Sequence, residues 1–517
     1  MAPYGVGEGE EVQEEEPWDP RAGSGALCRD DPRRVEACFG VCCLVLAGLL
    51  STVFLHSKQL VVDQVLPNRP EVVPWEPGFF DIHQLKAGSA EAALLVFPDG
   101  TTALVDAGDV EASSFEAKYN GTYHALRPPP GTTPGAQIAK YLEHFGVRTL
   151  DYVVVSHFHA DHCGYPWPSR AARKTYRVSG ISEVAERVKI KRLIDRGYPS
   201  YDFPVDLRAS GDRTAANYIA FVEALVASRN VTAERFEPGR SDQIAPVKKH
   251  LANFRVRNVK RDLDVSFLPD EPPRQIYRRD QVVSDPRPRR TARFDENRMS
   301  LAMVFEYGKF RYYTGGDNQH GAHAHLKDRL DWTDADTATP VAEAVGRVDV
   351  AKLNHHSHGT PPAFLRALEP EVVVMPSWNS DQPSEEALYL LTAEAPYRAS
   401  GSGRPYVPPD IFATWTAPET IVTRGPAIRK YASHDGHVLV RVYPPAPNAS
   451  ALFDDDHQRF DVFVLDDDFR LTSTHGPYVA TAAAGISGPP SDRLRRYNAH
   501  GGRARRTRSP RRRVRNR

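Results

Sequence analysis

Residues 153–166 read "VVVSHFHADHCGYP" and place three histidines and one aspartate within six positions, directly after a run of β-branched residues. In an extended segment, residues two apart point the same way, so His157 and His159 can hold one cation. Asp161 and His162 follow where the chain turns, and they can reach a second cation beside the first. Imidazole and carboxylate ligands suit zinc, and also iron or manganese. The H-x-H-x-D-H spacing therefore predicts half of a metal site.

Further polar clusters follow other expected strands. Asp106 and Asp109 come after "ALV", Asp317 after "FRYYTGG", and His355 and His356 after "VAKLN". If these strands belong to one layered core and run the same way, the clusters meet at a single edge, where a rigid scaffold presents chemistry. A carboxylate such as Asp317 can bridge two cations, and a late histidine can complete the second site. Two metals would hold hydroxide ready at neutral pH by lowering the pKa of a shared water.

The hydrophobic pattern predicts alternating strands and helices between about residues 79 and 468. Residues 133–146, "TPGAQIAKYLEHFG", have a capping threonine, a first-turn proline and apolar residues at helical spacing. A second amphipathic helix is expected at 214–229. Expected strands and hairpins cover 92–109, 150–156, 300–317, 348–356, 371–377, 436–443 and 460–468. The fold class is therefore α/β.

Four segments resemble, in order, the motifs of the metallo-β-lactamase fold superfamily: "LVDAGD", "SHFHADHCG", "YTGGD" and "AKLNHHSHGT". Their spacing is most similar to the hydrolase domain of ComEC-type DNA-uptake proteins and its free-standing relatives. The resemblance implies an αββα four-layer sandwich with a dinuclear metal site on one edge.

The resemblance also implies roles for individual residues. His157 and His159 bind the first metal, Asp161 and His162 the second, Asp317 bridges, and His355 completes the second site, with His356 as the open alternative. Asp106 orients a metal ligand without binding the metal itself, and Asp109 belongs to the same set of residues around the ligands. The implied cofactor is two divalent ions, zinc first, with manganese or iron as alternatives.

One departure concerns the first metal. Many members of the superfamily have another histidine before the bridging aspartate, whereas "FDENRMSLAMVF" at residues 294–305 offers Asn297 and Ser300. Partial occupancy of the first site, and a single-metal enzyme, therefore stay open.

The expected activity is hydrolysis by metal-bound hydroxide, with Asp161 as the catalytic carboxylate. The resemblance favours a phosphodiesterase or nuclease acting on a small molecule or nucleic acid. An ester, thioester or lactone hydrolase is the alternative, and a non-catalytic metal-binding scaffold is a third class. The intact ligand set argues against the scaffold.

Charge is unevenly distributed along the chain. Twelve arginines and no acidic residue lie between 493 and 517, and removing them leaves 54 Lys and Arg against 66 Asp and Glu, about −12 for residues 1–492. The body is mildly acidic, which argues against general nucleic-acid binding. The arginine-rich end is interpreted either as a contact for nucleic acid or another anion, or as a solvated disordered tail.

Residues 37–55 are 19 positions without a charge, enough for a transmembrane helix, with arginines just before them. This pattern predicts a type II single-pass signal anchor with a lumenal or extracellular catalytic domain. Sequons at Asn120, Asn230 and Asn448 predict glycosylation on that side. The expected order is an acidic cytoplasmic tail (1–36), the anchor (37–55), a linker (56–77), the hydrolase domain (78–445), a C-terminal β extension (446–480) and the arginine-rich tail (491–517).

Overall fold

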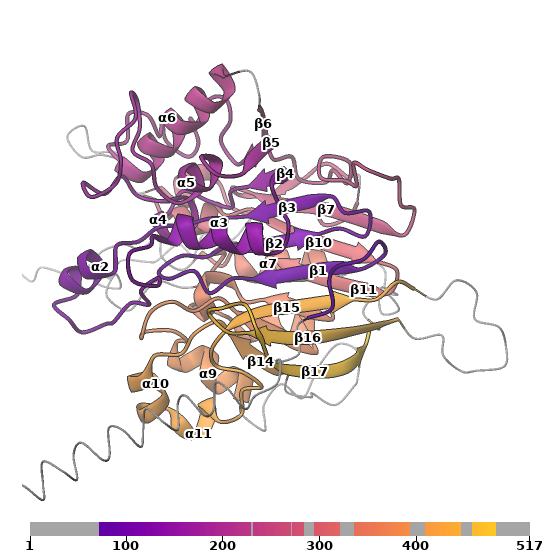
Figure 1. Ribbon diagram of the computed structural model, residues 1–517. Helices are drawn as coiled ribbons and strands as arrows, with labels where there is room; N and C mark the ends of the chain where they lie inside the picture. Colours follow the sequence, from indigo (N-terminus) through magenta and orange to yellow (C-terminus); the bar gives the residue numbers. More distant parts are fainter. Residues whose placement is uncertain are drawn as a thin grey trace, which may run out of the picture. The chain divides into compact units, whose positions relative to one another are not determined.

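The structure is a computed structural model that describes residues 72–228, 231–269, 271–283, 294–320, 335–392, 409–445 and 458–481. The chain divides between Arg69 and Pro70 into two units, and all of the described residues lie in the second. In that unit, two β-sheets face each other and helices cover their outer faces (Figure 1).

The first sheet has nine strands in the order β17-β16-β15-β1-β2-β3-β4-β5-β6. They are β1 Phe80–Gln84, β2 Ala93–Val96, β3 Thr102–Val105, β4 Thr149–Val154, β5 Lys189–Asp195, β6 Thr232–Arg235, β15 His437–Val442, β16 Arg459–Leu465 and β17 Leu471–Val479. Strands β3 to β6 run parallel, whereas β2 and β3 form the expected hairpin. Strand β1 lies between β2 and β15, and Arg441 of β15 donates to both carboxylate oxygens of Asp81 at 2.9 and 2.7 Å.

The second sheet has eight strands in the order β14-β13-β12-β11-β10-β7-β8-β9. They are β7 Phe254–Arg261, β8 Asp264–Val265, β9 Arg274–Gln275, β10 Ala302–Tyr307, β11 Phe310–Thr314, β12 Val350–Lys352, β13 Val372–Met375 and β14 Asp410–Ala413. Strands β10 and β11 form the second expected hairpin, and β11 to β14 run parallel.

Helices lie on both outer faces (Figure 1). The described helices are α2 Ala112–Lys118, α3 Pro134–His144, α4 Ala160–Cys163, α5 Ile181–Ala185, α6 Arg213–Ala227, α7 Ala338–Val345, α8 Pro362–Leu368, α9 Glu385–Thr392, α10 Pro418–Thr423 and α11 Gly425–Ile428. The expected cap of α3 is present, because the Thr133 side chain accepts a hydrogen bond from the N–H of Ala136. Helix α6 has an Asp212 cap that accepts from two backbone N–H groups.

Strand β4 shows how the layers form. Tyr152 and Val154 point into the core between the two sheets, while Val153 points into the core shared with α3, α5 and α6. This alternation is the period of two that a strand imposes. A third core joins the second sheet to α7, α8 and α9. The predicted four-layer αββα sandwich is confirmed for the described residues.

The transmembrane helix expected before the sandwich needs correction. The longest described helix, α6, has 15 residues and is about 22 Å long at 1.5 Å per residue, shorter than a hydrocarbon core of about 30 Å. No helix in the described part of the chain is long and apolar enough to cross a membrane. Residues 37–55 lie outside the described residues, so the fold class is the sandwich alone, without an assigned membrane helix.

The strand order brings the polar clusters to one edge. Strands β3 and β4 are parallel neighbours in the first sheet, and β11 and β12 are parallel neighbours in the second. Asp106, His157, Asp317 and His356 follow the carboxyl ends of these four strands.

Candidate metal centre

The H-x-H part of the motif lies in an extended segment that follows β4. His157 is fully buried and His159 is half-buried, and Nε2 of His157 lies 3.2 Å from Nδ1 of His159. The two imidazoles therefore lie together, as their two-residue spacing predicts.

The D-H part follows in α4, a single turn that redirects the chain after His159. Nε2 of His162 lies 3.1 Å from Oδ2 of Asp317 and 3.8 Å from Oδ2 of Asp161. Nδ1 of His162 lies 2.9 Å from Oδ2 of Asp106. An imidazole that gives its Nδ1 proton to a carboxylate keeps the lone pair of Nε2 for a metal.

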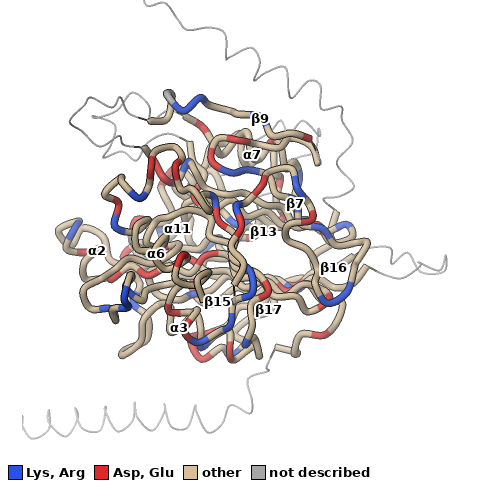
Figure 2. Tube along the Cα trace, turned by 90° about the horizontal axis from the view of Figure 1, so that it is seen from above, with Lys and Arg blue, Asp and Glu red and all other residues tan. Residues whose placement is uncertain are grey.

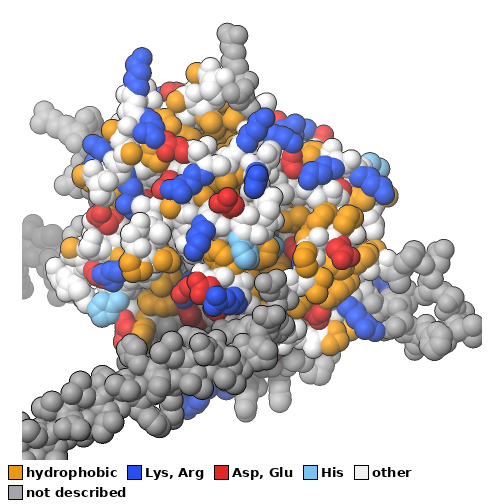
Figure 3. Space-filling model, in the orientation of Figure 1, with side chains coloured by type: hydrophobic (Ala, Val, Ile, Leu, Met, Phe, Trp, Pro, Cys, Tyr) orange, Lys and Arg blue, Asp and Glu red, His pale blue; other side chains and the backbone are white. Residues whose placement is uncertain are grey.

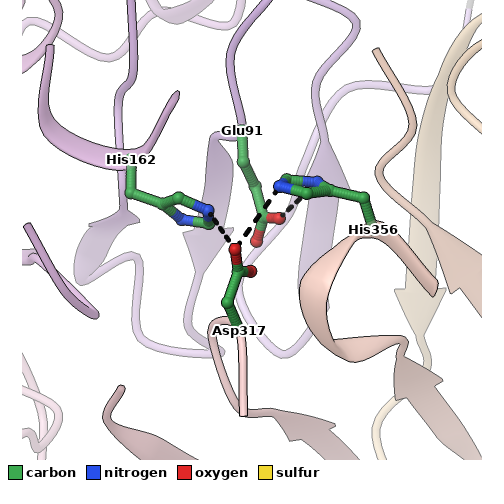
Figure 4. A group of neighbouring side chains, drawn as sticks. All are labelled: Glu91, His162, Asp317 and His356. Atoms are coloured by element: carbon green, nitrogen blue, oxygen red, sulfur yellow. Dashed lines mark hydrogen bonds and ion pairs between the residues drawn. The ribbon is translucent and has the colours of Figure 1, made fainter. Parts of the chain in front are cut away.

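Two groups of potential ligands result. The three-residue group is His157, His159 and Asp317, and the four-residue group is Glu91, His162, Asp317 and His356. Within each group, the potential ligand atoms all lie within 4.8 Å of one another. Figure 4 shows the four-residue group, with side chains from four separate segments pointing toward one another.

Asp317 belongs to both groups. Its Oδ2 atom lies 3.7 Å from Nε2 of His157, 3.1 Å from that of His162 and 3.6 Å from that of His356. The turn before it requires Gly316, which has φ +51°, and a Cβ there would lie 2.9 Å from Ser156 Cβ. The shared carboxylate places the two groups side by side, as a bridging ligand would.

His356, and not His355, enters the four-residue group. Its Nε2 atom lies 2.9 Å from Oδ2 of Asp161, and Nδ1 lies 2.8 Å from the carbonyl of Pro376. Nε2 of His355 instead lies 3.0 Å from Nδ2 of Asn297. Both histidines have φ +49°. The structure thus favours the alternative that the sequence left open, because the left-handed turn directs the two rings to different partners.

The two aspartates after β3 have different surroundings. Asp106 accepts from the backbone N–H and the hydroxyl of Ser156, and it also orients His162. Asp109 is fully buried in an ion pair with Arg170, at 2.6 and 2.7 Å. Asp106 therefore contacts a potential ligand directly, whereas Asp109 anchors the segment that follows the motif.

Glu91 was not predicted from the sequence. Its Oε1 atom lies 2.6 Å from Nζ of Lys352, and its Oε2 atom lies 3.3 Å from Nδ1 of His356. Nζ of Lys352 also donates to the carbonyl of Gly316 at 2.8 Å. The only sequence signal was a lysine inside a buried strand, since a buried charge requires a partner.

Arg196 and Glu296 support the H-x-H segment, and they too were not predicted. The Arg196 guanidinium donates to both oxygens of Glu296, at 2.8 and 2.6 Å. Oε1 of Glu296 accepts from the N–H of Phe158, between the two histidines, at 2.9 Å. The segment that follows strand β5 is thereby connected to the candidate ligands.

Electrostatics in both groups favour binding of a positive charge. Burial disfavours the charged form of His162, yet the carboxylates of Asp317, Asp161 and Asp106 raise its pKa well above the ordinary value. Burial would raise the pKa of Asp317, but the neighbouring histidines hold it well below its usual range. Burial lowers the pKa of His157. Protons on imidazoles thus balance the carboxylates, and a divalent cation can replace them.

Oxygen atoms without a hydrogen-bond donor provide a second test of whether these residues fit a divalent cation. Oδ1 of Asp317 and Oδ1 of Asn297 are buried, and neither has a hydrogen-bond donor among the described residues. Buried polar atoms are rarely left unsatisfied, and a cation is a partner for oxygen acceptors. Imidazoles, carboxylates and free oxygens are a donor set that fits zinc, manganese or iron.

The predicted glycosylation sites are only partly described. Asn120 is exposed in a turn after α2, whereas Asn230 and Asn448 lie outside the described residues. Glycosylation stays a prediction.

Comparison with protein families gives a match in the first part of the described chain. Residues 88–165, which include Glu91, Asp106 and the H-x-H-x-D-H motif, match the metallo-beta-lactamase superfamily. Curated proteins give no match to this chain. The closer resemblance to ComEC-type domains stays a prediction.

Three solved structures match this chain at low identity and with TM-scores below 0.5. A diphosphatase from the PhnP family matches with 9% identity and a TM-score of 0.26, covering 57% of this chain and 85% of that one. Zinc-bound PqqB from Methylobacterium extorquens matches with 10% identity and a TM-score of 0.25, covering 57% and 87%. The short form of human tRNase Z matches with 10% identity and a TM-score of 0.23, covering 57% and 91%.

Proposed function

We propose that this chain, whose residues 88–165 match the metallo-beta-lactamase superfamily, is a metal-dependent hydrolase, and specifically a phosphodiesterase that uses two divalent cations. The observation that carries the proposal is the position of Asp317, whose Oδ2 atom faces histidines of both groups at 3.1 to 3.7 Å. Paired cations bridged by a carboxylate suit phosphodiester hydrolysis, because both the attacking and the leaving oxygen need stabilisation.

The proposed ligands are those of the two groups with one exchange: Asp161, whose Oδ2 atom lies 2.9 Å from Nε2 of His356, takes the place of Glu91, which is paired with Lys352. His157 and His159 hold the first cation, and Asp161, His162 and His356 hold the second, with Asp317 shared. Zinc is the proposed metal, with manganese or iron as alternatives. Divalent cations in both positions supply Lewis acidity, which activates water and neutralises charge on the phosphoryl oxygens.

Asp161 is the proposed catalytic carboxylate. Its side chain is 15% exposed, compared with 2% for Asp317, so it lies toward the open side of the site together with the half-buried His159. Burial alone would raise its pKa, but His162 and His356 hold the pKa of Asp161 below its usual range. An ionised carboxylate in this position accepts a hydrogen bond from the attacking water and orients it toward phosphorus.

The distribution of charged side chains on the surface indicates what size of substrate can bind. Figure 2 shows acidic and basic residues interspersed along the described chain, and on the face in Figure 3 the basic side chains are scattered among acidic and apolar ones. An extended single-stranded nucleic acid needs a continuous positive groove. We therefore propose a small phosphodiester, or the end of a nucleic acid, as substrate. The arginine-rich residues 493–517, outside the described residues, stay a predicted anion contact.

Hydrolysis of bis(p-nitrophenyl) phosphate by the purified full-length chain tests the proposal. We expect turnover that chelation abolishes and zinc or manganese restores. Asp161→Ala should abolish it as well, and the exposed His250→Ala is the matched control that keeps wild-type activity. Cleavage of p-nitrophenyl acetate, a thioester or a lactone, without cleavage of the phosphodiester by metal-loaded protein, would refute the phosphodiesterase and identify an acyl hydrolase.

A further inference from the structure

Asn297 is a buried amide in the segment between the H-x-H-x-D-H motif and Asp317. It lies in the short helix η2 Glu296–Met299 and is 4% exposed. Its Nδ2 atom lies 3.0 Å from Nε2 of His355, whereas Oδ1 has no donor in the part of the chain that the structure describes. A buried amide oxygen without a partner is unfavourable unless something else satisfies it.

Hydrogen bonds on both sides of Asn297 connect its segment to the ligands of the three-residue group. On one side, Glu296 accepts from the N–H of Phe158, which lies between the two histidines of the motif. On the other side, the Ser300 hydroxyl accepts from the N–H of Asp317 at 3.0 Å. Asn297 therefore lies between the segments that carry all three members of that group.

The two groups differ in their number of ligands. The four-residue group has four buried members and Asp161 beside it, whereas the three-residue group has three members, one of them half-buried. The three-residue group is therefore one protein ligand short of the four-residue group, and Asn297 Oδ1, in the adjoining segment, is an oxygen acceptor without a donor among the described residues.

We propose that Asn297 Oδ1 is the fourth protein ligand of the first cation, an inference that rests on the metal-ligand roles in the proposed function. The first position then has two imidazoles, one carboxylate and one amide oxygen. His355 has a positioning role, because its contact with Nδ2 directs the amide oxygen away from it. Amide and carboxylate oxygens suit harder cations such as Mn²⁺ better than an added imidazole does.

Unequal affinities follow from this ligand set. An amide oxygen adds no charge, so the first position has only the shared Asp317 carboxylate, while the second has Asp161 as well. Glu91 contributes little further charge, because Lys352 neutralises it. The second position should therefore retain its cation, and the first should exchange its cation readily and accept Mn²⁺.

Metal binding tests this without reference to activity. The full-length chain is titrated with Mn²⁺ and with Zn²⁺, following free Mn²⁺ by electron paramagnetic resonance and bound metal by elemental analysis after dialysis. We expect one tight and one weak site in the wild type. Asn297→Leu should weaken the weak site at least tenfold and leave the tight site unchanged. Asn297→His should tighten the weak site for Zn²⁺ at least tenfold.

Asn258→Leu is the matched control. Asn258 is also fully buried with an unpaired Oδ1, but its amide donates to Glu237 and Gln243, so the change should leave both metal affinities unchanged. Wild-type affinity of Asn297→Leu at both sites would overturn the inference, and so would equal weakening of both sites. If the metal affinities are as expected but the metal-loaded wild-type chain shows no phosphodiester turnover, the proposed substrate is refuted and the ligand assignment stands.

Discussion

The carboxylate of Glu91 and the ammonium group of Lys352 form an ion pair of 2.6 Å in which both side chains are at least 96% buried. The pair lies beside the proposed second metal position, because Glu91 also contacts His356 and Lys352 holds the turn before Asp317. It connects three segments that are distant in the sequence and keeps one acidic side chain of the site neutralised.

Removing one member of this pair should be strongly destabilising. In Lys352→Met the Glu91 carboxylate stays buried without its cation, and we expect the free energy of unfolding to fall by about 3–5 kcal/mol in urea titrations. The double variant Glu91→Gln/Lys352→Met should recover more than half of that loss, since no unpaired charge remains. A single variant within about 1 kcal/mol of the wild type would contradict the pairing.

Arg196→Lys tests the support of the H-x-H segment. Lysine cannot reproduce the two bonds to Glu296 together with the third to Asp262 at 3.0 Å. We expect a loss of about 2–3 kcal/mol in unfolding free energy and weaker binding of one cation. Arg192→Lys, in strand β5 just before Arg196 and 38% exposed, is the control and should change neither quantity.

Separate variants of His355 and His356 show which of these two adjacent histidines binds the second cation. His356→Gln should lose at least one bound cation per chain and most turnover, because it removes a member of the four-residue group. His355→Gln should keep the tightly bound cation, because His355 contacts Asn297 instead. Elemental analysis after dialysis measures both, and the reverse pattern would assign the ligand to His355.

Stability should decrease in mild acid because of two buried histidines that belong to neither metal-ligand group. Burial, with Arg441 nearby, lowers the pKa of His83 from 6.5 to about 3, and burial, with Lys86 nearby, does the same for His437. Between pH 6.5 and about 3, these two histidines bind more protons in the unfolded chain than in the folded one. The stability that the neutral buried histidines provide is therefore complete above pH 6.5 and is lost as the pH falls toward 3.

The slope of this loss can be measured by urea unfolding between pH 6 and 4. Each histidine should contribute up to about 1.4 kcal/mol per pH unit. His437→Gln should reduce the slope by about that amount, and an unchanged slope would show that His437 does not titrate on unfolding.

Local rules explain what the sequence could predict. Helix α3 begins at Pro134 after the Thr133 cap, as its pattern requires, and the hairpins at β2–β3 and β10–β11 form where apolar runs flank turn residues. The H-x-H-x-D-H spacing likewise depends on neighbours only, so the sequence alone identified four candidate ligands.

Long-range contacts explain what the sequence could not predict. The Glu91 side chain becomes part of the site through its contacts with Lys352 and His356, and no local pattern pairs residues so far apart. Three consecutive residues with positive φ, His355 to Ser357, decide which histidine faces Asp317. Strand β1 was not predicted because three of its five buried residues, Asp81, His83 and Gln84, are polar, so its sequence lacks the apolar pattern of a buried strand.

The position of β1 also constrains the order of events during synthesis. Its partner strand β15 and the cation for Asp81 lie 360 positions later in the chain. At about 5–20 residues per second, the side of β1 that pairs with β15 remains an open edge for roughly 20 to 70 seconds after β1 is synthesised. An open edge with an uncompensated carboxylate can neither complete the sheet nor bury Asp81. The nascent chain therefore reaches its native state only after residue 441 has been synthesised, and chains shortened before that residue should be substrates for chaperones rather than stable fragments.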